Sequence, residues 1–244
     1  MMTPLLETRR LSKQFGGLLA LDELSFQVQR GEILGIVGHN GAGKSTLFHL
    51  ITGFLRPTSG EILFEGHPVT AWPPYRRVRR GLAPTFQQTR LFYGLTVEEN
   101  VRLGCFTQQR GGLRRFLLGT PHREQLTMQR RVNEILALTG LERFRAQPAS
   151  QLSSYGYQRR LEVAIALGSG PKLLLLDEPF GGLSPSGIEE MGQLIQTLHD
   201  AGLTIMFIEH RMKSIWSYCS RLFVMSGGRL LIPQPAREAL HAPR

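Results

Sequence analysis

The sequence of 244 residues is poor in cysteine, with only Cys105 and Cys219. These two residues lie far apart and match no paired metal-binding or redox spacing, which excludes a disulfide framework. Apolar runs such as residues 173–176 are far shorter than the roughly 20 residues of a membrane span. The first residues, Met-Met-Thr-Pro-Leu-Leu-Glu, lack the apolar region of a secretory signal. The sequence therefore predicts a cytosolic protein that reaches a membrane only through a partner.

Acidic residues are scarcer than basic ones. The chain has 19 Asp and Glu residues against 29 Lys and Arg residues, a formal net charge of +10. Such a charge suits nucleic acid or an anionic membrane surface. Its densest runs, at residues 76–80 and 114–115, lack the interleaved aromatic residues of a base-stacking surface. We therefore expect a solvated or membrane-facing basic surface, and nucleic acid is not expected as a partner.

The pattern of apolar segments indicates an α/β fold. Short apolar runs predict strands at residues 24–28, 33–37, 61–64, 173–176, 204–208 and 222–225. Helical patterns lie between several of these strands, at residues 44–52, 157–167 and 186–198. Alternation of strands and helices predicts a mainly parallel sheet. Hairpin-like segments near the start predict an N-terminal antiparallel β addition.

Strand signals vanish between residues 91 and 150, which predicts an inserted helical subdomain. One helix is expected over residues 123–138. Its apolar residues lie on an approximate helical face formed by Leu126, Val132, Ile135, Leu136 and Leu138.

A glycine-rich loop follows the predicted strand at residues 33–37. It reads Gly38-His39-Asn40-Gly41-Ala42-Gly43-Lys44-Ser45-Thr46 and leads directly into a predicted helix. A strand, a glycine-rich turn and a helix in this order bind phosphate through converging backbone N–H groups. Lys44 would reach the β- and γ-phosphates, and Ser45 would ligate Mg²⁺. The residues assigned to nucleotide binding are Gly38, Asn40, Gly41, Gly43, Lys44, Ser45 and Thr46, and the sequence predicts ATP binding and hydrolysis.

Two acidic residues, Asp177 and Glu178, end the apolar strand at residues 173–176. Ligands of open α/β sheets gather at the carboxyl ends of the strands. We expect Asp177 to hold a hydrated Mg²⁺, and Glu178 to orient or deprotonate the water that attacks the γ-phosphate. Taken alone, the pair suits an exposed strand end before Pro179 equally well. Beside the phosphate loop it indicates catalysis.

In this order the motifs resemble those of the ATP-binding subunits of ABC transporters, through nearly the whole chain. The resemblance implies that Phe15, in Gln-Phe-Gly-Gly-Leu, stacks on adenine. Without the other motifs, Phe15 could equally be a residue of the hydrophobic core. It implies that Gln87 contacts Mg²⁺ or the attacking water and reports nucleotide state to a transmembrane subunit. His210 is similar to the switch histidine that contacts the γ-phosphate.

Residues 153–162, Ser-Ser-Tyr-Gly-Tyr-Gln-Arg-Arg-Leu-Glu, resemble the signature motif, which binds the ATP held by the opposite subunit. Ser154 and Gly156 fit this chemistry, because a hydroxyl and open backbone N–H groups at a helix start can bind phosphate. The resemblance therefore implies a second ABC ATPase subunit, either the same chain or a different one.

Several positions depart from the usual family pattern. A tyrosine at the place of Tyr155 occurs in the branched-chain amino acid subgroup. The other departures are Ser153, Tyr157, Ile165, Ser184 and Arg211. They weaken expected ion pairs and signature contacts more than they affect nucleotide binding.

Three segments, at residues 15–18, 81–92 and 158–162, are most similar to the ATPases of high-affinity branched-chain amino acid import. The resemblance implies an ATP-hydrolysing importer subunit that energises uptake of branched-chain amino acids or related small polar solutes. It implies transmembrane permease subunits as partners and, indirectly, a periplasmic or extracellular substrate-binding protein. The chain would lie peripherally on the cytoplasmic face of the plasma membrane. Two alternatives stay open: a soluble nucleic-acid-associated ABC ATPase, and an ABC subunit with degenerate catalysis.

The expected fold is thus a P-loop NTPase core with an N-terminal antiparallel β addition and an inserted helical subdomain. Residues 1–87 would form the first part of the nucleotide-binding core, and residues 88–158 the helical subdomain with the signature motif. Residues 159–244 would complete the core.

Overall fold

The computed structural model describes residues 3–85, 91–107, 122–210 and 216–235. Its centre is a six-stranded sheet with the strand order β10-β9-β3-β8-β7-β6. All neighbouring strands pair in parallel except β10, which is antiparallel to β9. The six strands are β3 (Ile33–Val37), β6 (Leu82–Pro84), β7 (Leu173–Asp177), β8 (Thr204–Glu209), β9 (Arg221–Ser226) and β10 (Arg229–Pro235). The predicted mainly parallel sheet is confirmed.

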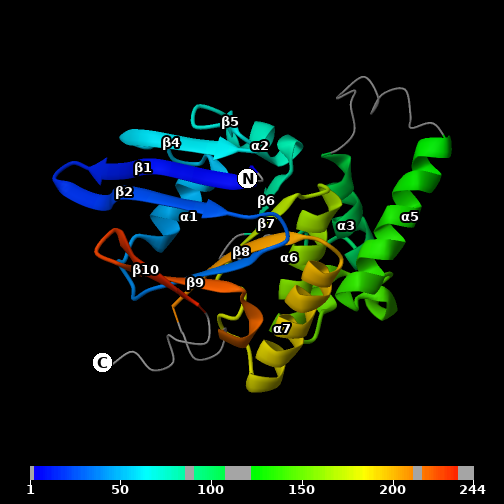
Figure 1. The fold of residues 1–244 in the computed structure, drawn as a ribbon. Helices are drawn as coiled ribbons and strands as arrows, with labels where there is room; N and C mark the ends of the chain where they lie inside the picture. The colour runs from blue at the N-terminus through cyan, green and yellow to red at the C-terminus, as the bar shows by residue number, and fades with distance from the viewer. Residues whose placement is uncertain (1–2, 86–90, 108–121, 211–215, 236–244) are drawn as a thin grey trace.

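A second sheet of four antiparallel strands covers one face of the central sheet (Figure 1). Its order is β2-β1-β4-β5, and its strands are β1 (Leu6–Phe15), β2 (Leu18–Val28), β4 (Ser59–Phe64) and β5 (His67–Pro68). Helix α1 (Lys44–Thr52) shares one apolar core with strands of both sheets. The predicted N-terminal antiparallel addition is therefore confirmed, and it is larger than the short segments indicated.

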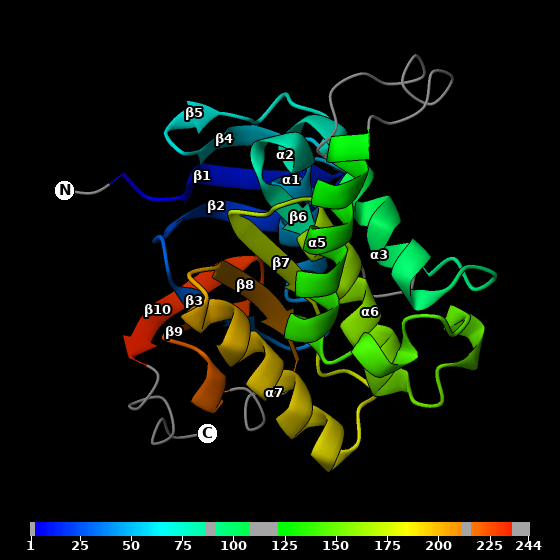
Figure 2. The ribbon, with the colours of Figure 1, turned by 90° about the vertical axis from the view of Figure 1, so that its right-hand side faces the viewer.

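Four longer helices lie on the other face of the central sheet, as Figure 2 shows. They are α3 (Val97–Phe106), α5 (His122–Thr139), α6 (Tyr155–Gly168) and α7 (Pro185–Asp200). A short helix, α2 (Pro74–Arg80), precedes β6, and single 3₁₀ turns occupy Glu142–Phe144, Ala149–Gln151 and Trp216–Tyr218. Within the described residues, no helix combines the length and the apolar character needed to span a membrane.

The predicted apolar face of α5 is only partly right. Val132, Ile135 and Leu136 are buried, whereas Leu126 and Leu138 are 49% and 41% exposed. Each of these two leucines lies six residues from Val132, which turns it about 120° away on an α-helix. They therefore fall outside the stripe that packs on α3 and α6.

The central strands are apolar without interruption because both of their faces are covered. On β7, Leu174 and Leu176 face the core on the helical side, whereas Leu173 and Leu175 face the core under the antiparallel sheet. Strands β3 and β7 both pair with β8. The residues that follow β3, β7 and β8 therefore leave the sheet at the same edge.

Helices α3 and α6 cross with their backbones in contact. A Cβ atom on Gly104 of α3 would lie 2.1 Å from the carbonyl oxygen of Ile165 in α6. On the other side of the crossing, a Cβ atom on Gly168 would lie 2.7 Å from the backbone nitrogen of Cys105. Only glycine permits this approach, so the two helices form one packed unit.

The C-terminus of α1 is held by a buried arginine, Arg77, which is 1% exposed. Its Nη1 atom donates to the carbonyl oxygens of Leu50 and Ile51, both at 2.7 Å. Its Nε and Nη2 atoms donate to Trp72 and Thr70, at 3.0 and 2.9 Å. Burial lowers the pKa of Arg77 to about 10. The guanidinium satisfies carbonyl oxygens that α1 leaves unpaired at its end.

We expect Arg77→Met to lower the free energy of unfolding by about 2–4 kcal/mol, because buried carbonyl oxygens lose their charged donor. Denaturant unfolding measures this change. The control is Arg79→Met on the exposed side of the same helix, which should change the free energy by less than about 0.5 kcal/mol. Equal losses in both variants would contradict the capping role of Arg77.

Candidate nucleotide-binding site

The loop between β3 and α1 is shaped by glycines. Gly41 and Gly43 have φ angles of +82° and +102°, values that side chains rarely tolerate. A Cβ atom on Gly43 would also lie 2.6 Å from the carbonyl oxygen of Ala20 in β2. At the start of the loop, a Cβ atom on Gly38 would lie 2.3 Å from the carbonyl oxygen of Met225. The glycines let the loop pass close to two strands before α1 begins at Lys44.

The Lys44 side chain turns back into this loop. Its Nζ atom donates to the carbonyl oxygens of Gly38 and His39, at 2.7 and 3.0 Å. Burial lowers the pKa of Lys44. Three nearby carboxylates oppose this shift and keep the ammonium favourable: Glu178, Glu209 and Asp177. A cation held beside exposed loop backbone is suited to phosphate binding.

The next residues of α1 carry the remaining predicted contacts. Ser45 is exposed and Thr46 is half-buried in the first turn, and Asn40 and Gly41 are exposed in the loop. The hydroxyls and backbone groups of the loop are thus accessible from one side. This arrangement has the form of an anion site at a helix N-terminus, with Lys44 as a second, independent cation.

Asp177, at the end of β7, is 5% exposed, and its backbone N–H donates to Thr85 Oγ1 at 3.4 Å. Burial, then the charge of Glu178, raises the pKa of Asp177 to about 6. Its buried Oδ1 atom has no hydrogen-bond partner within the described part of the chain. An unpaired buried carboxylate oxygen fits a hard cation such as Mg²⁺.

The described residues contain no cluster of three or more His, Cys, Asp or Glu side chains able to hold a metal ion. A cation at Asp177 would therefore take its other ligands from phosphate oxygens, the Ser45 hydroxyl and water, as Mg²⁺ commonly does. The residues present fit that kind of shared coordination.

The raised pKa of Asp177 has a testable consequence for stability. The folded chain disfavours the ionised carboxylate, so ionisation lowers the free energy of unfolding as pH rises from about 4 to above 6. From the usual pKa of 3.8 to about 6, the difference is on the order of 3 kcal/mol. Asp177→Asn should raise the melting temperature without nucleotide at pH 8 by on the order of 5 °C. At pH 5 about half of that gain should remain and near pH 4 most of it should disappear, because the carboxylate is then protonated in the folded chain and increasingly in the unfolded chain. An equal gain at pH 4 and pH 8 would contradict this role of Asp177.

Glu178 has a backbone φ of +48°, the left-handed conformation that is rare for residues other than glycine. Its N–H donates to the carbonyl oxygen of Ile208 at 3.0 Å, which ties this strained turn to β8. Its Oε1 atom lies 4.0 Å from Nδ1 of His210. The structure thus brings together two of the three residues predicted to take part in catalysis. The third, Gln87, lies outside the described residues.

A buried carboxylate that the sequence interpretation missed, Glu209, joins these parts. Its Oε1 atom accepts a hydrogen bond from the N–H of Phe180 at 2.9 Å, and Oε2 accepts one from the N–H of His210 at 3.2 Å. Burial raises its pKa. Glu209 therefore fixes the turn after Glu178 relative to His210. The sequence did contain a pattern that could have indicated this role, because Glu209 ends an apolar strand and directly precedes His210.

Phe15 ends β1 and is 45% exposed, so it is not a core residue. Lys13 Nζ lies 4.9 Å from the centre of its ring. The hairpin that carries Phe15 continues into β2, where Ala20 meets Gly43 of the phosphate loop. The exposed ring of Phe15, on the hairpin whose second strand contacts this loop, remains available for the predicted stacking on adenine.

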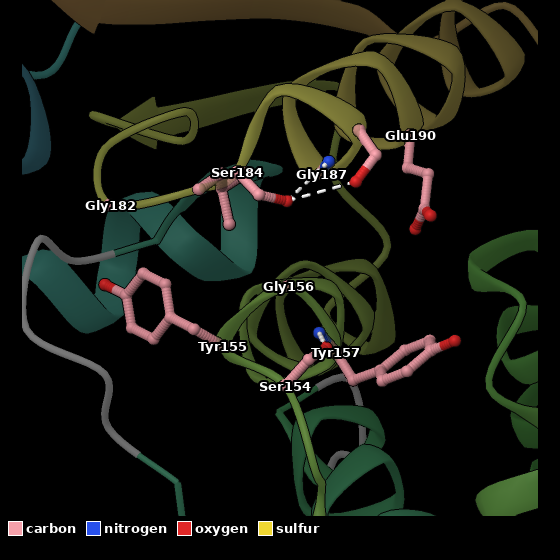
Figure 3. A pocket seen from close by; sticks show the side chains of 10 residues that line it. Ser154, Tyr155, Gly156, Tyr157, Gly182, Ser184, Gly187 and Glu190 are labelled. Atoms are coloured by element: carbon pink, nitrogen blue, oxygen red, sulfur yellow. Dashed lines mark hydrogen bonds between the residues drawn. The ribbon is translucent and has the colours of Figure 1, made fainter.

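The predicted signature residues line one side of a separate pocket of about 420 Å³ (Figure 3). Ser154 caps α6, with its Oγ accepting a hydrogen bond from the N–H of Tyr157 at 3.3 Å. Across the pocket, Ser184 caps α7 by accepting one from Gly187 at 3.2 Å. The described residues lining this pocket come from residues 154–157 and 182–190, and none from residues 38–46. The phosphate loop and the signature are thus different surfaces of one chain.

The fold and the glycine loop define a P-loop nucleotide-binding protein. Comparison with known proteins assigns its family. A family model described as ABC transporter matches residues 21–181. The branched-chain amino acid transport ATP-binding protein LivG of Salmonella typhimurium is 37% identical, covering 100% of this chain and 96% of the relative. BraF of Pseudomonas aeruginosa is 35% identical, covering 93% and 90%.

A solved structure, the ADP conformation of MJ1267, an ATP-binding cassette of an ABC transporter, is similar throughout. It has a TM-score of 0.86 and 30% identity, covering 98% of this chain and 96% of that one. The chain therefore belongs to the ATP-binding subunits of ABC transporters, which are ATPases.

Proposed function

We propose that this chain is the ATPase subunit of an importer for branched-chain amino acids or related small polar solutes. Lys44 and the loop glycines would bind the phosphates of ATP, and Phe15 would stack on adenine. Ser45 and Asp177 would hold Mg²⁺ together with Gln87, and the ion would draw charge from the γ-phosphate. Glu178 would accept the proton of the attacking water, and His210 would contact the γ-phosphate.

The observation that carries this proposal is the convergence of charges at one sheet edge. The Lys44 ammonium is close enough to the carboxylates of Asp177, Glu178 and Glu209 for each of them to stabilise its charge. Lys44 follows β3, whereas the three acids stand at the ends of β7 and β8. A phosphate-binding cation, an unpaired carboxylate for a metal and a strained glutamate for water thus share one region. This combination supports phosphoryl transfer to water.

The separate position of Ser154 and Gly156 supports a shared site. Since these residues do not line the phosphate loop of their own chain, they are available to the nucleotide of a second subunit. Two chains facing head to tail would then close around ATP and reopen after hydrolysis. The second subunit would be the same chain or a related one, and closure would move transmembrane permease subunits. The division into residues 1–87, 88–158 and 159–244 remains a prediction.

The choice of cargo rests on the relatives, whose names specify branched-chain amino acid transport. An ATPase of such an importer would lie peripherally on the cytoplasmic face of the plasma membrane, with a substrate-binding protein acting on the far side.

Affinity purification of the tagged chain from membranes tests the assembly. Two permease subunits and a second ATPase should co-purify. Uptake of labelled leucine by cells lacking the chain should fall, with urea and amide uptake as the comparison. Co-purification of ribosomes or DNA instead of permeases would overturn the importer assignment, and loss of urea but not leucine uptake would overturn the cargo.

A further inference from the structure

The two tyrosines of the signature segment point in opposite directions, as Figure 3 shows. The ring of Tyr157 packs on Phe144, with ring centres 4.6 Å apart, and its hydroxyl accepts a hydrogen bond from Arg143. The ring of Tyr155 instead lies against Gly182, in the loop that connects β7 to α7. A Cβ atom on Gly182 would be 3.2 Å from Cε1 of Tyr155. The signature therefore touches the loop that follows its own chain's Glu178.

This loop is compact between Gly182 and Glu178. The N–H of Gly181 donates to the carbonyl oxygen of Glu178 at 3.1 Å. A Cβ atom on Gly181 would lie 3.8 Å from Oε2 of Glu178, so the carboxylate packs beside the Gly181 backbone. Leu183 closes the next turn by donating to Phe180 at 3.3 Å. A displacement of Gly182 would consequently also move Gly181, which is hydrogen-bonded to the Glu178 backbone and packs beside its carboxylate.

The Tyr155 ring is also contacted by Arg159, one turn further along α6. The Arg159 guanidinium lies 5.0 Å from the ring centre. Its Nη1 atom donates to Glu162 Oε2 at 2.9 Å, and both side chains are more than 90% buried. A buried, paired arginine has little freedom to move. The ring therefore contacts both a buried, paired cation on α6 and the backbone of the loop that follows Glu178.

We propose that Tyr155 is a positioning residue that couples the signature of this chain to its own Glu178. In this arrangement, ATP held by the opposite subunit binds to Ser154 and Gly156. This binding keeps the adjacent Tyr155 ring in contact with Gly182. The loop then holds Glu178 in the geometry for hydrolysis of the ATP on the phosphate loop of the same chain. The inference rests on the proposed function, since it takes the signature as the contact for the opposite nucleotide and Glu178 as the general base. It would make hydrolysis at one site responsive to occupancy of the other.

The test uses the purified transporter complex and steady-state ATP hydrolysis. Tyr155→Ala should lower kcat about tenfold and change KM less than about twofold, because Lys44 and its loop are untouched. Tyr155→Phe keeps the ring and should retain kcat within about twofold of wild type. The control is Tyr75→Ala, which removes a tyrosine that is 67% exposed on α2 and should have no effect. A Phe variant as slow as the Ala variant would contradict a role for ring contact.

A double-substitution cycle with Gly182→Ala tests the contact itself. Gly182 has a φ of +75°, so the methyl of Gly182→Ala both strains the backbone and meets the Tyr155 ring, and this variant alone should also lower kcat. The doubly substituted chain should lose less than the product of the two single effects, because one substitution removes the partner of the other. Single effects that multiply would show that the two residues act independently, and the coupling would be rejected.

Glu178→Gln in the same assay distinguishes failure of the catalytic role of Glu178 from failure of the coupling through Tyr155. If that variant hydrolyses ATP normally, the proposed catalytic assignment fails whatever Tyr155 does. If it is inactive while Tyr155→Ala is fully active, the catalytic assignment stands and only the coupling fails. A rise in KM alone in Tyr155→Ala would assign the ring to nucleotide binding and would also overturn the coupling.

Discussion

Glu178→Gln is expected to lower kcat for ATP hydrolysis by about 10³-fold while ATP affinity stays within a few fold of wild type. Glutamine matches glutamate in size and keeps the backbone hydrogen bond from residue 178 to Ile208, so the turn should be preserved. The amide, however, cannot accept a proton from water at neutral pH. The loss would therefore appear in turnover, as expected for a group that acts in the transition state.

Single-turnover hydrolysis and equilibrium binding of ATP to the same preparation measure the two quantities. Glu189→Gln is the matched control, because Glu189 is exposed on α7 and outside the site. Hydrolysis by Glu178→Gln at the wild-type rate would falsify the assignment of Glu178 as general base. Parallel loss of binding and turnover would instead indicate that the turn had collapsed.

Lys44→Ala should weaken ATP binding by about 10²-fold. The ammonium is buried, and it already donates to two loop carbonyl oxygens, so phosphate would exchange neutral acceptors for charged ones. A charged hydrogen bond in such a place contributes about 1.5–3 kcal/mol, equivalent to roughly 10- to 150-fold in affinity.

Calorimetric titration with Mg²⁺ and ATP measures this change. Lys172→Ala provides the comparison, since Lys172 pairs with Glu65 just before β7, at the opposite end of that strand from Asp177. Its affinity for ATP should match wild type. An unchanged affinity in Lys44→Ala would contradict the assignment of the phosphate loop.

The parts of the site that could be predicted are those whose chemistry is contiguous in sequence. The loop from Gly38 to Thr46 and the pair Asp177 and Glu178 each hold the residues of their proposed role within a few positions of a strand end. Their neighbourhood in space then follows from the rule that parallel strands end at one edge of a sheet. Helix α1 has its predicted bounds because glycines flank it on both sides.

The features that could not be predicted depend on contacts between distant segments. Glu209 is a support because Phe180, 29 residues away, donates to it. The contact of Tyr155 with Gly182 likewise joins a helix start to a loop beyond the next strand. The exposure of the Phe15 side chain could not be predicted, because a single phenylalanine is equally compatible with the hydrophobic core and with a ligand-binding surface. Nothing in the neighbouring sequence distinguishes Arg77, which is buried, from the other arginines at residues 76–80.

The glycine crossing of α3 and α6 has a mechanical consequence for the signature. Because the backbones touch at Gly104 and Ile165, neither helix can rotate there without carrying the other. Ser154 lies eleven residues before Ile165, about 16 Å along the helix axis. A rotation of about 5° at the crossing would move Ser154 by about 1.4 Å, half a hydrogen-bond length. If Ser154 binds the nucleotide of a second subunit, as proposed, small rotations of α6 about this crossing would set whether the Ser154 hydroxyl reaches the phosphate.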